Sequence, residues 1–193
     1  GKYCQLFETA VYHMPSKSHK GGDDNKFEQS DFDNQYLKSI RNFIRKWGVW
    51  PGKVWDNNRD MIVPKKYNIG LVAQNCDRFE VLHFLEPWCT TIYISDLQVI
   101  LNYTRTEQEK TLFDLTDRVK SIHTKNYNND IIVEFDSTKL NDERVKFIEN
   151  LPYILDDSGQ PGTEMQYDIF RVIIKEKINV VNNNIKNGRD ENV

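Results

Sequence analysis

The sequence is poor in residues that cross-link a chain, interrupt its regular structure or let it span a membrane. Its 193 residues include three cysteines, six prolines and nine glycines. The cysteines Cys4, Cys76 and Cys89 match no disulfide framework or zinc pattern, which indicates a reducing compartment and small apolar roles for Cys76 and Cys89. No apolar run approaches the roughly 20 residues of a transmembrane helix. These absences exclude disulfide-rich, collagen-like and membrane-spanning proteins.

An excess of basic charge is also missing. Lys and Arg number 26 against 29 Asp and Glu, so the net charge is -3 at pH 7. Because proteins that bind nucleic acid usually carry positive charge, we expect no nucleic-acid partner. No secretory leader is recognisable, so we expect a cytoplasmic protein, with the cytoplasmic face of a membrane as the alternative. The chain begins without Met, in a strand-like segment, and we expect it to be a piece of a longer protein.

What the sequence does contain is typical of a globular protein, with 38% hydrophobic and 12% aromatic residues. Strand and helix patterns alternate over residues 67–180 in the order β-α-β-α-β-α-β. This order predicts an α/β fold, a small and mainly parallel sheet flanked by helices. The expected strands are residues 67–73, 90–95, 130–136 and 167–180, and the expected helices are residues 77–89, 105–122 and 141–157.

The first part of the chain has a different organisation. A strand ending at His13 is followed by a long polar loop and an amphipathic helix that ends at Gly48. The helix should dock on the second segment or on a body outside this chain. Its basic residues, Arg41 and Arg45 among them, should lie on a solvated face opposite Phe43. We expect three regions: the strand, loop and helix at 1–60, an α/β domain at 61–181, and a disordered tail at 182–193.

Signals for chemistry in the α/β domain are sparse. The chain has no GxGxxG and no GxxxxGK[ST], which argues against a dinucleotide or P-loop site. Asp96 and Asp136 each follow an expected strand, where a carboxylate can bind a metal or act as a base. Capping of the next turn or helix is the alternative for both.

Two further residues could take part in binding. Trp88 follows Glu86, as in a sugar-binding platform, although packing in the core is the favoured interpretation. His13 ends a strand at the mouth of a loop that carries Lys17 and Lys20. An imidazole at that place can bind a divalent metal, and the lysines can face phosphate oxygens. The alternative for His13 is a bond to a nearby backbone carbonyl.

The first quarter of the chain resembles the end of the catalytic domain of family 2 glycosyltransferases. The resemblance rests on Val11-Tyr12-His13, followed by a polar loop and then by Phe43-Ile44-Arg45-Lys46-Trp47-Gly48. It implies a GT-A catalytic fold in the parent protein, continued by an appended α/β domain. It also implies that His13 helps to bind a Mn or Mg ion on the sugar-nucleotide diphosphate, and that the following loop closes over the donor.

The same resemblance implies what this chain lacks. The family's DXD motif and catalytic base lie upstream, and Asp31–Asp33 is rejected as a DXD motif because it precedes a helix. We therefore expect no catalytic residue, no cofactor and no transferase activity in the chain alone. The full-length protein would take a nucleotide-sugar donor and a glycan acceptor, with the α/β domain positioning acceptor or assembling copies into a homo-oligomer. The alternatives are a non-enzymatic protein-interaction domain and a free-standing nucleotide-binding enzyme.

Overall fold

A computed structural model describes residues 29–51, 66–124 and 126–178. The chain divides into two compact units, residues 1–37 and 38–193. The described part of the first unit is the beginning of helix α1 (Gln29–Trp47), and the rest of α1 belongs to the second unit. The predicted N-terminal strand, its loop and the C-terminal tail lie outside the described residues.

The predicted amphipathic helix is confirmed as α1. It ends at Gly48, as predicted, and the Gly48 N–H donates to the Ile44 carbonyl at 2.7 Å. Gly48 has a φ of +69°, a left-handed conformation that favours glycine at a helix end. In the second unit Ile44 is buried. In the first unit Tyr36 and Leu37 are exposed.

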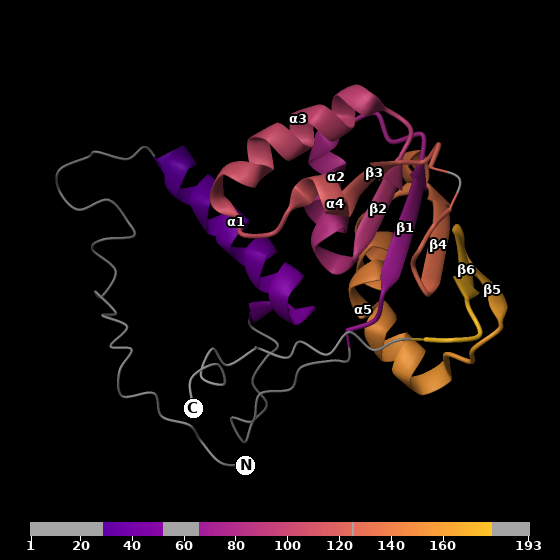
Figure 1. Cartoon of the computed structure of the whole chain (residues 1–193). Coiled ribbons are helices and arrows are strands. Elements are labelled where there is room, and N and C mark those ends of the chain that lie inside the picture. Colours follow the sequence, from indigo (N-terminus) through magenta and orange to yellow (C-terminus); the bar gives the residue numbers. More distant parts are fainter. Residues whose placement is uncertain (1–28, 52–65, 125, 179–193) are drawn as a thin grey trace, which may run out of the picture. The chain divides into compact units, whose positions relative to one another are not determined.

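The second unit is an α/β structure built on a six-stranded mixed sheet (Figure 1). The order is β3-β2-β1-β4-β6-β5. Strands β3, β2, β1 and β4 are parallel, as expected for a mainly parallel sheet. Strand β6 is antiparallel to β4, and β5 is antiparallel to β6. The bounds are β1 (Ile69–Gln74), β2 (Thr91–Ile94), β3 (Val119–Ser121), β4 (Ile131–Asp136), β5 (Glu164–Tyr167) and β6 (Phe170–Ile174).

Short helical elements connect the strands. The bounds are α2 (Phe79–Leu85), η2 (Glu86–Trp88), α3 (Leu97–Glu107), η3 (Gln108–Lys110), α4 (Leu115–Arg118), η4 (Ser137–Lys139) and α5 (Asp142–Ser158). The Asn141 side chain caps α5 by accepting from the Arg144 N–H at 2.9 Å.

Two predicted elements were wrong in extent. The helix expected over residues 105–122 is divided, because α3 ends at Glu107 and a new cap at Asp114 starts α4. Its last residues form β3, which pairs with β2. The strand expected over 167–180 is shorter, since β6 is Phe170–Ile174, and it pairs through a turn at Asp168, with a φ of 50°, with β5 (Glu164–Tyr167), most of which precedes the expected strand.

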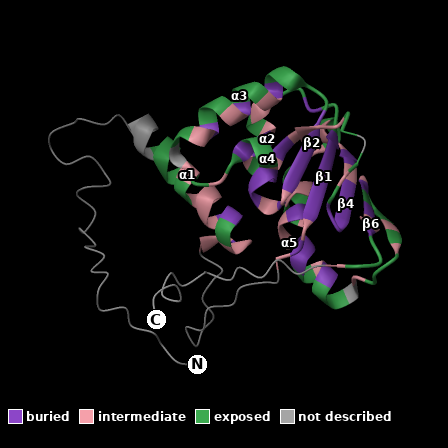
Figure 2. Cartoon of the chain, in the orientation of Figure 1, coloured by how far each residue is buried: buried purple, intermediate pink, exposed green. Residues whose placement is uncertain are grey.

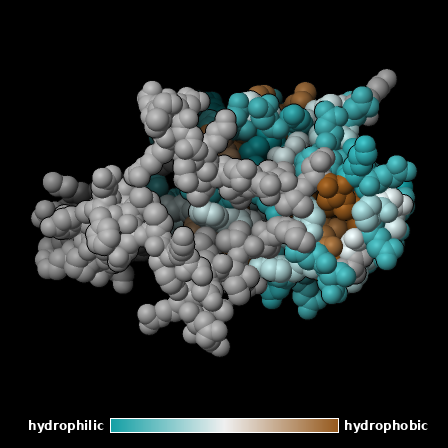
Figure 3. All heavy atoms as spheres, turned by 60° about the horizontal axis from the view of Figure 1, so that its bottom comes forward, coloured by the Kyte–Doolittle hydropathy of each residue, from teal (hydrophilic) through white to brown (hydrophobic). Residues whose placement is uncertain are grey.

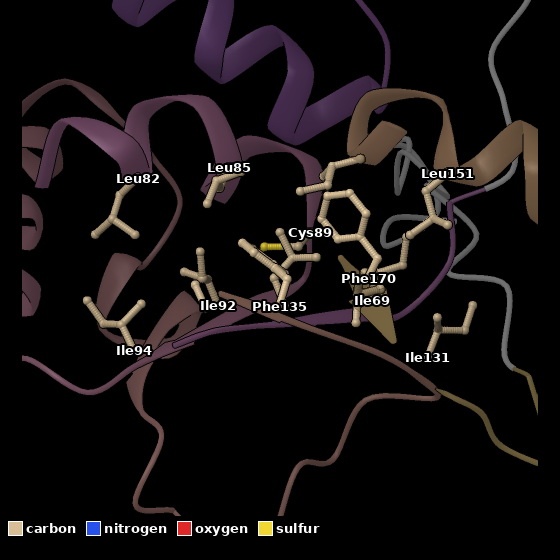
Figure 4. Packing of buried hydrophobic residues seen from close by; sticks show 14 of the residues in the cluster. Ile69, Leu82, Leu85, Cys89, Ile92, Ile94, Ile131, Phe135, Leu151 and Phe170 are labelled. Atoms are coloured by element: carbon tan, nitrogen blue, oxygen red, sulfur yellow. The ribbon is translucent and has the colours of Figure 1, made fainter. Parts of the chain in front are cut away.

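The main core lies between one face of the sheet and the helices. Leu82, Leu85 and Leu151 point from α2 and α5 toward strand residues such as Ile92 and Phe135 (Figure 4). Strands β1 and β2 and most of β4 are buried, whereas the helices combine buried and exposed residues (Figure 2). Twelve apolar residues of the strands and helices predicted from the sequence are buried: Ile69, Leu71, Leu82, Leu85, Ile92, Tyr93, Ile131, Val133, Phe135, Ile148, Leu151 and Val172. Two further apolar residues of these segments, Phe147 and Ile169, are only partly buried.

The opposite face of the sheet carries a smaller cluster. Val72, Tyr93 and Ile132 are buried there, and Ile122 and Tyr127 from the β3–β4 connection pack on them. Since α2 and α5 both contribute to the main core, the connections after β1 and β4 run on the same face. The strand order reverses between β1 and β4, the place where open α/β sheets usually bind nucleotides, but here the connections after both strands cover the same face of the sheet.

Candidate functional site, a polar pocket on the sheet

Asp96 and Asp136 both act as caps in the structure. The Asp96 carboxylate accepts from the N–H groups of Gln98 and Val99, at 2.7 and 3.2 Å, at the start of α3. The Asp136 carboxylate accepts from the Thr138 hydroxyl at 2.7 Å and its N–H at 3.0 Å, and these bonds lower the pKa of Asp136. In the described ranges no three His, Cys, Asp or Glu residues are grouped to hold a metal. The sequence-predicted residues His13, Lys17 and Lys20 lie outside those ranges.

Glu86 and Trp88 do not form an open sugar platform. Glu86 is fully buried, and its carboxylate accepts from Arg45 and Tyr103, at 2.7 and 2.9 Å, and also from Arg118. Trp88 is partly buried, with its ring 5.8 Å from that of Trp50. These contacts agree with the packing interpretation of Trp88.

The expectation that Arg41 and Arg45 lie on a solvated face is wrong. Arg45 is fully buried between Glu86 and Glu107, and Arg41 forms two bonds of 2.7 Å to the Glu107 carboxylate. Burial opposes the charge of Glu86, but Arg118 and Arg45 outweigh it and lower its pKa. Burial also opposes the charge of Arg45, and Glu86 outweighs it so that the pKa of Arg45 is raised. The cluster therefore stays ionised, and it joins α1 to the sheet unit.

A polar pocket of about 230 Å³ opens on the other face of the sheet, beside the amino-terminal ends of β1, β2 and β4. It is smaller than the roughly 300–1,000 Å³ of pockets for drug-sized ligands, so it suits a ligand of about one ring. Its lining is Asn68, Thr90, Thr91, Tyr93, Lys120, Thr124, Asn126, Asn128 and Asn129.

The wall of the pocket is a chain of hydrogen bonds between the buried side chains of Tyr93 and Asn129 and the partly buried side chain of Asn68. The Tyr93 hydroxyl donates to Asn129 Oδ1 at 2.8 Å, and Asn129 Nδ2 donates to Asn68 Oδ1 at 2.8 Å. Only 2% of Asn129 is exposed. A Cβ atom at position 70 would lie 2.5 Å from Asn129 Oδ1, so Gly70 provides the space for this side chain. The wall is thus preorganised before any ligand binds.

The β3–β4 connection is fixed over the sheet beside this wall. The Tyr127 ring lies 4.5 Å from the Tyr93 ring, and Lys175 Nζ donates to the Tyr127 carbonyl at 2.9 Å. At the start of β4, the Asp130 N–H donates to the Asn68 carbonyl at 3.0 Å. The contacts of Tyr127 and Asp130 therefore hold the pocket-lining residues of this connection in place over the sheet.

The lining determines what the pocket can do chemically. Amide and hydroxyl groups dominate it, and Lys120 is the one residue with a formal charge among the described lining residues. These described residues include no Asp, Glu, His or Cys, the usual general bases, nucleophiles and metal ligands. Their arrangement can bind a polar molecule. Sequence reasoning missed this pocket, since its one signal was the set of asparagines at positions 126, 128 and 129.

Comparison of the chain with known protein families, with curated proteins and with solved structures finds no match. No helix in the described ranges is long and apolar enough to cross a membrane.

Proposed function

We propose that the chain is the C-terminal part of a nucleotide-sugar-dependent glycosyltransferase and that its α/β domain binds the glycan acceptor without catalysing transfer. The observation that carries the acceptor-binding role is the pocket, whose lining is almost entirely amide and hydroxyl. The link to a glycosyltransferase comes from the resemblance of Val11-Tyr12-His13 and residues 43–48 to that family.

Sugar hydroxyl groups both donate and accept hydrogen bonds, and so do the side chains of this pocket. Asn offers an acceptor and two donors, and Thr offers one hydroxyl that can do either. Thr124, Asn126 and Asn128 line the pocket and are exposed, so their side chains can exchange water for a ligand. Asn129 is bound to Tyr93 and Asn68 and fixes the wall.

Under this proposal, the full-length parent protein binds the sugar-nucleotide donor. His13 would contact a Mn or Mg ion there, and Lys17 and Lys20 would contact the donor phosphates. One imidazole does not hold such ions, which prefer several oxygen ligands. The purified chain should consequently show no turnover of sugar nucleotides. Turnover by the 193-residue chain would contradict the assignment of a non-catalytic role.

Binding of glycans to the purified chain tests the proposal directly. Isothermal titration against a panel of neutral and acidic monosaccharides and short glycans should identify ligands with one site per chain. Asn126→Ala and Thr124→Ala should weaken binding, because each removes an exposed lining group. Asn102→Ala, an exposed change on α3 away from the pocket, is the matched control. The proposal fails if no glycan binds, or if all three variants bind equally well.

A protein-interaction domain is the second candidate, and one surface feature favours it. Leu97 and Leu101, one helical turn apart on α3, are 60% and 59% exposed. The described surface seen in Figure 3 is otherwise mainly hydrophilic, with small hydrophobic patches. If this candidate is right, the chain self-associates in sedimentation experiments and the double change Leu97→Ser with Leu101→Ser abolishes association. A monomeric chain at high concentration would argue against assembly through this surface.

A further inference from the structure

Lys120 is the one charged residue among the described residues that line the pocket. It lies in β3, where it pairs in register with Tyr93 of β2. It is partly buried, and it follows Val119, which belongs to the main core. Because β3 is the edge strand beside β2, this lysine adds a positive charge to the pocket at the edge of the sheet.

No carboxylate neutralises Lys120 within the described ranges. No hydrogen bond or ion pair joins its side chain to another described residue. The other lysine near the connection, Lys175, is bound to the Tyr127 carbonyl. The nearest acidic residue along the connection, Asp130, is 9% exposed and does not line the pocket. The cation of the pocket is therefore available to a ligand.

We infer that the pocket selects a sugar that carries an anionic group, a carboxylate or a phosphate, and that Lys120 is the residue that determines this specificity. This inference rests on the proposed glycan-binding function. The amides and hydroxyls contact the hydroxyl groups of the ring, and the Lys120 ammonium donates to the anionic oxygen. A charge-assisted hydrogen bond is shorter and about twice as strong as a neutral one, so one contact separates acidic from neutral sugars.

The size and charge of the pocket agree with this ligand. A volume of about 230 Å³ accommodates about one ring, and a single cation matches a single anionic group. A polyanion such as a nucleic acid would need several cations along a groove, which this lining does not provide. The inference is thus restricted to acidic monosaccharide units, free or at the end of a glycan.

Matched pairs of ligands test the inference by titration calorimetry. The pairs are glucose with glucuronate, galactose with galacturonate, and glucose with glucose 6-phosphate, and acetate and inorganic phosphate alone report simple anion binding. The acidic member should bind about tenfold to a hundredfold more tightly, the range that a hydrogen bond to a charged group contributes. The carboxylate and phosphate arms identify which anionic group is preferred.

Variants of Lys120 assign the preference to one side chain. Lys120→Met should bring the affinities for the acidic and the neutral member of each pair to about the same value, whereas Lys120→Arg should retain the preference. Equal affinity for acidic and neutral sugars, an unchanged preference in Lys120→Met, or binding of acetate and phosphate alone as tightly as the acidic sugars would overturn the inference and leave glycan binding standing. Failure of every sugar to bind would instead overturn the proposed function itself.

Discussion

Arg45 and Glu86 form an ion pair in which neither side chain is exposed to solvent, with Nη2 of Arg45 2.7 Å from Oε2 of Glu86. The two residues are 41 positions apart in the sequence, one in α1 and the other in η2. Arg118 reaches the same carboxylate and also donates to the carbonyls of Glu86 and Cys89, at 3.0 and 2.6 Å. Through the Glu86 carboxylate, Arg45 of α1 is linked to the connection between β1 and β2, which contains Glu86, and to the connection between β2 and β3, which contains Arg118.

Breaking this pair should strongly destabilise the fold. Glu86→Gln leaves Arg118 without its carboxylate and Arg45 with Glu107 alone, and removal of one partner of a buried ion pair costs about 3–5 kcal/mol. Urea unfolding followed by circular dichroism measures the change. Glu164→Gln, which breaks the exposed pair with Arg171, is the control and should change the free energy of unfolding far less. Equal effects of the two variants would show that the buried pair does not stabilise α1 against the sheet unit.

Gly70 and Asn129 should be energetically coupled. Gly70→Ala places a methyl group against the Asn129 side chain and should both destabilise the chain and weaken ligand binding, because Asn129 must leave the wall. In the double variant with Asn129→Ala the two shortest contacts, to Oδ1 and Cγ of residue 129, are removed, so its destabilisation should be smaller than the sum of the two single changes, by about 0.5–3 kcal/mol. Additive effects in the double-mutant cycle would contradict the close fit.

Stability should fall in mild acid because of His83. Burial and the charge of Arg41 lower the pKa of His83, and Glu107, with Oε2 3.9 Å from Nε2, opposes them. Between the two pKa values the unfolded chain binds more protons than the folded one. The contribution of neutral His83 to the free energy of unfolding is complete above the pKa of this residue in the unfolded chain, about 6.5. It is lost as the pH falls toward the lower pKa of His83 in the folded chain. Unfolding between pH 8 and 5 should show this slope, and His83→Gln should lack that part of it.

Lys66 should give a second pH dependence, at alkaline pH. Burial and then the charge of Arg118 lower the pKa of Lys66 from 10.5 to about 8, while Nζ donates to the Arg45 carbonyl. The unfolded chain therefore binds the extra proton between pH 8 and 10.5, and stability should rise with pH across this window. Comparison with Lys66→Met isolates the effect, since that variant has no amine to titrate. A parallel pH profile for both proteins would show that Lys66 is solvated.

Val133 tests the placement of the core. It lies in β4, pairs with Leu71 of β1 and is completely buried. Val133→Asp puts an unpaired charge between the sheet and the helices, where desolvation costs several kcal/mol, so the variant should not fold. Lys139→Asp, on the exposed 3-10 turn after β4, is the control. If Val133→Asp unfolds cooperatively at a temperature close to that of the unmodified chain, Val133 lies outside the core.

The elements that could be predicted are those with a strong local pattern. The apolar run over Ile69–Ala73 is typical of a buried strand, and the spacing of Ile40, Ile44 and Trp47 is typical of a helix face. Strand β5 was missed because Glu164–Tyr167 is an exposed edge strand that depends on pairing with β6. Its polar sequence carries little periodic signal of its own.

The buried charges and the pocket could not be predicted for a related reason. Arg45 lies next to Ile44 on the helix, and the distant carboxylates of Glu86 and Glu107 make its burial favourable. The pocket depends on Asn129 reaching Asn68, 61 residues earlier, and on the space beside Gly70. Contacts between residues so far apart in the sequence form only in the tertiary structure, which overrides the local conformational preference of each segment. By contrast, Asp96 and Asp136 occupy capping positions that the sequence had already offered as one alternative.

The strand order has a consequence for how the chain reaches its native state. Strand β1 lies in the centre of the parallel strands, and its neighbour β4 begins only at Ile131, after both β2 and β3. During synthesis one edge of β1 must wait for a partner that emerges much later. Sheets with pairings so distant in sequence fold slowly, and their unpaired edges associate readily with other chains. Fragments that end before β4 should therefore aggregate rather than fold, so that truncation experiments on this domain require the chain through β6.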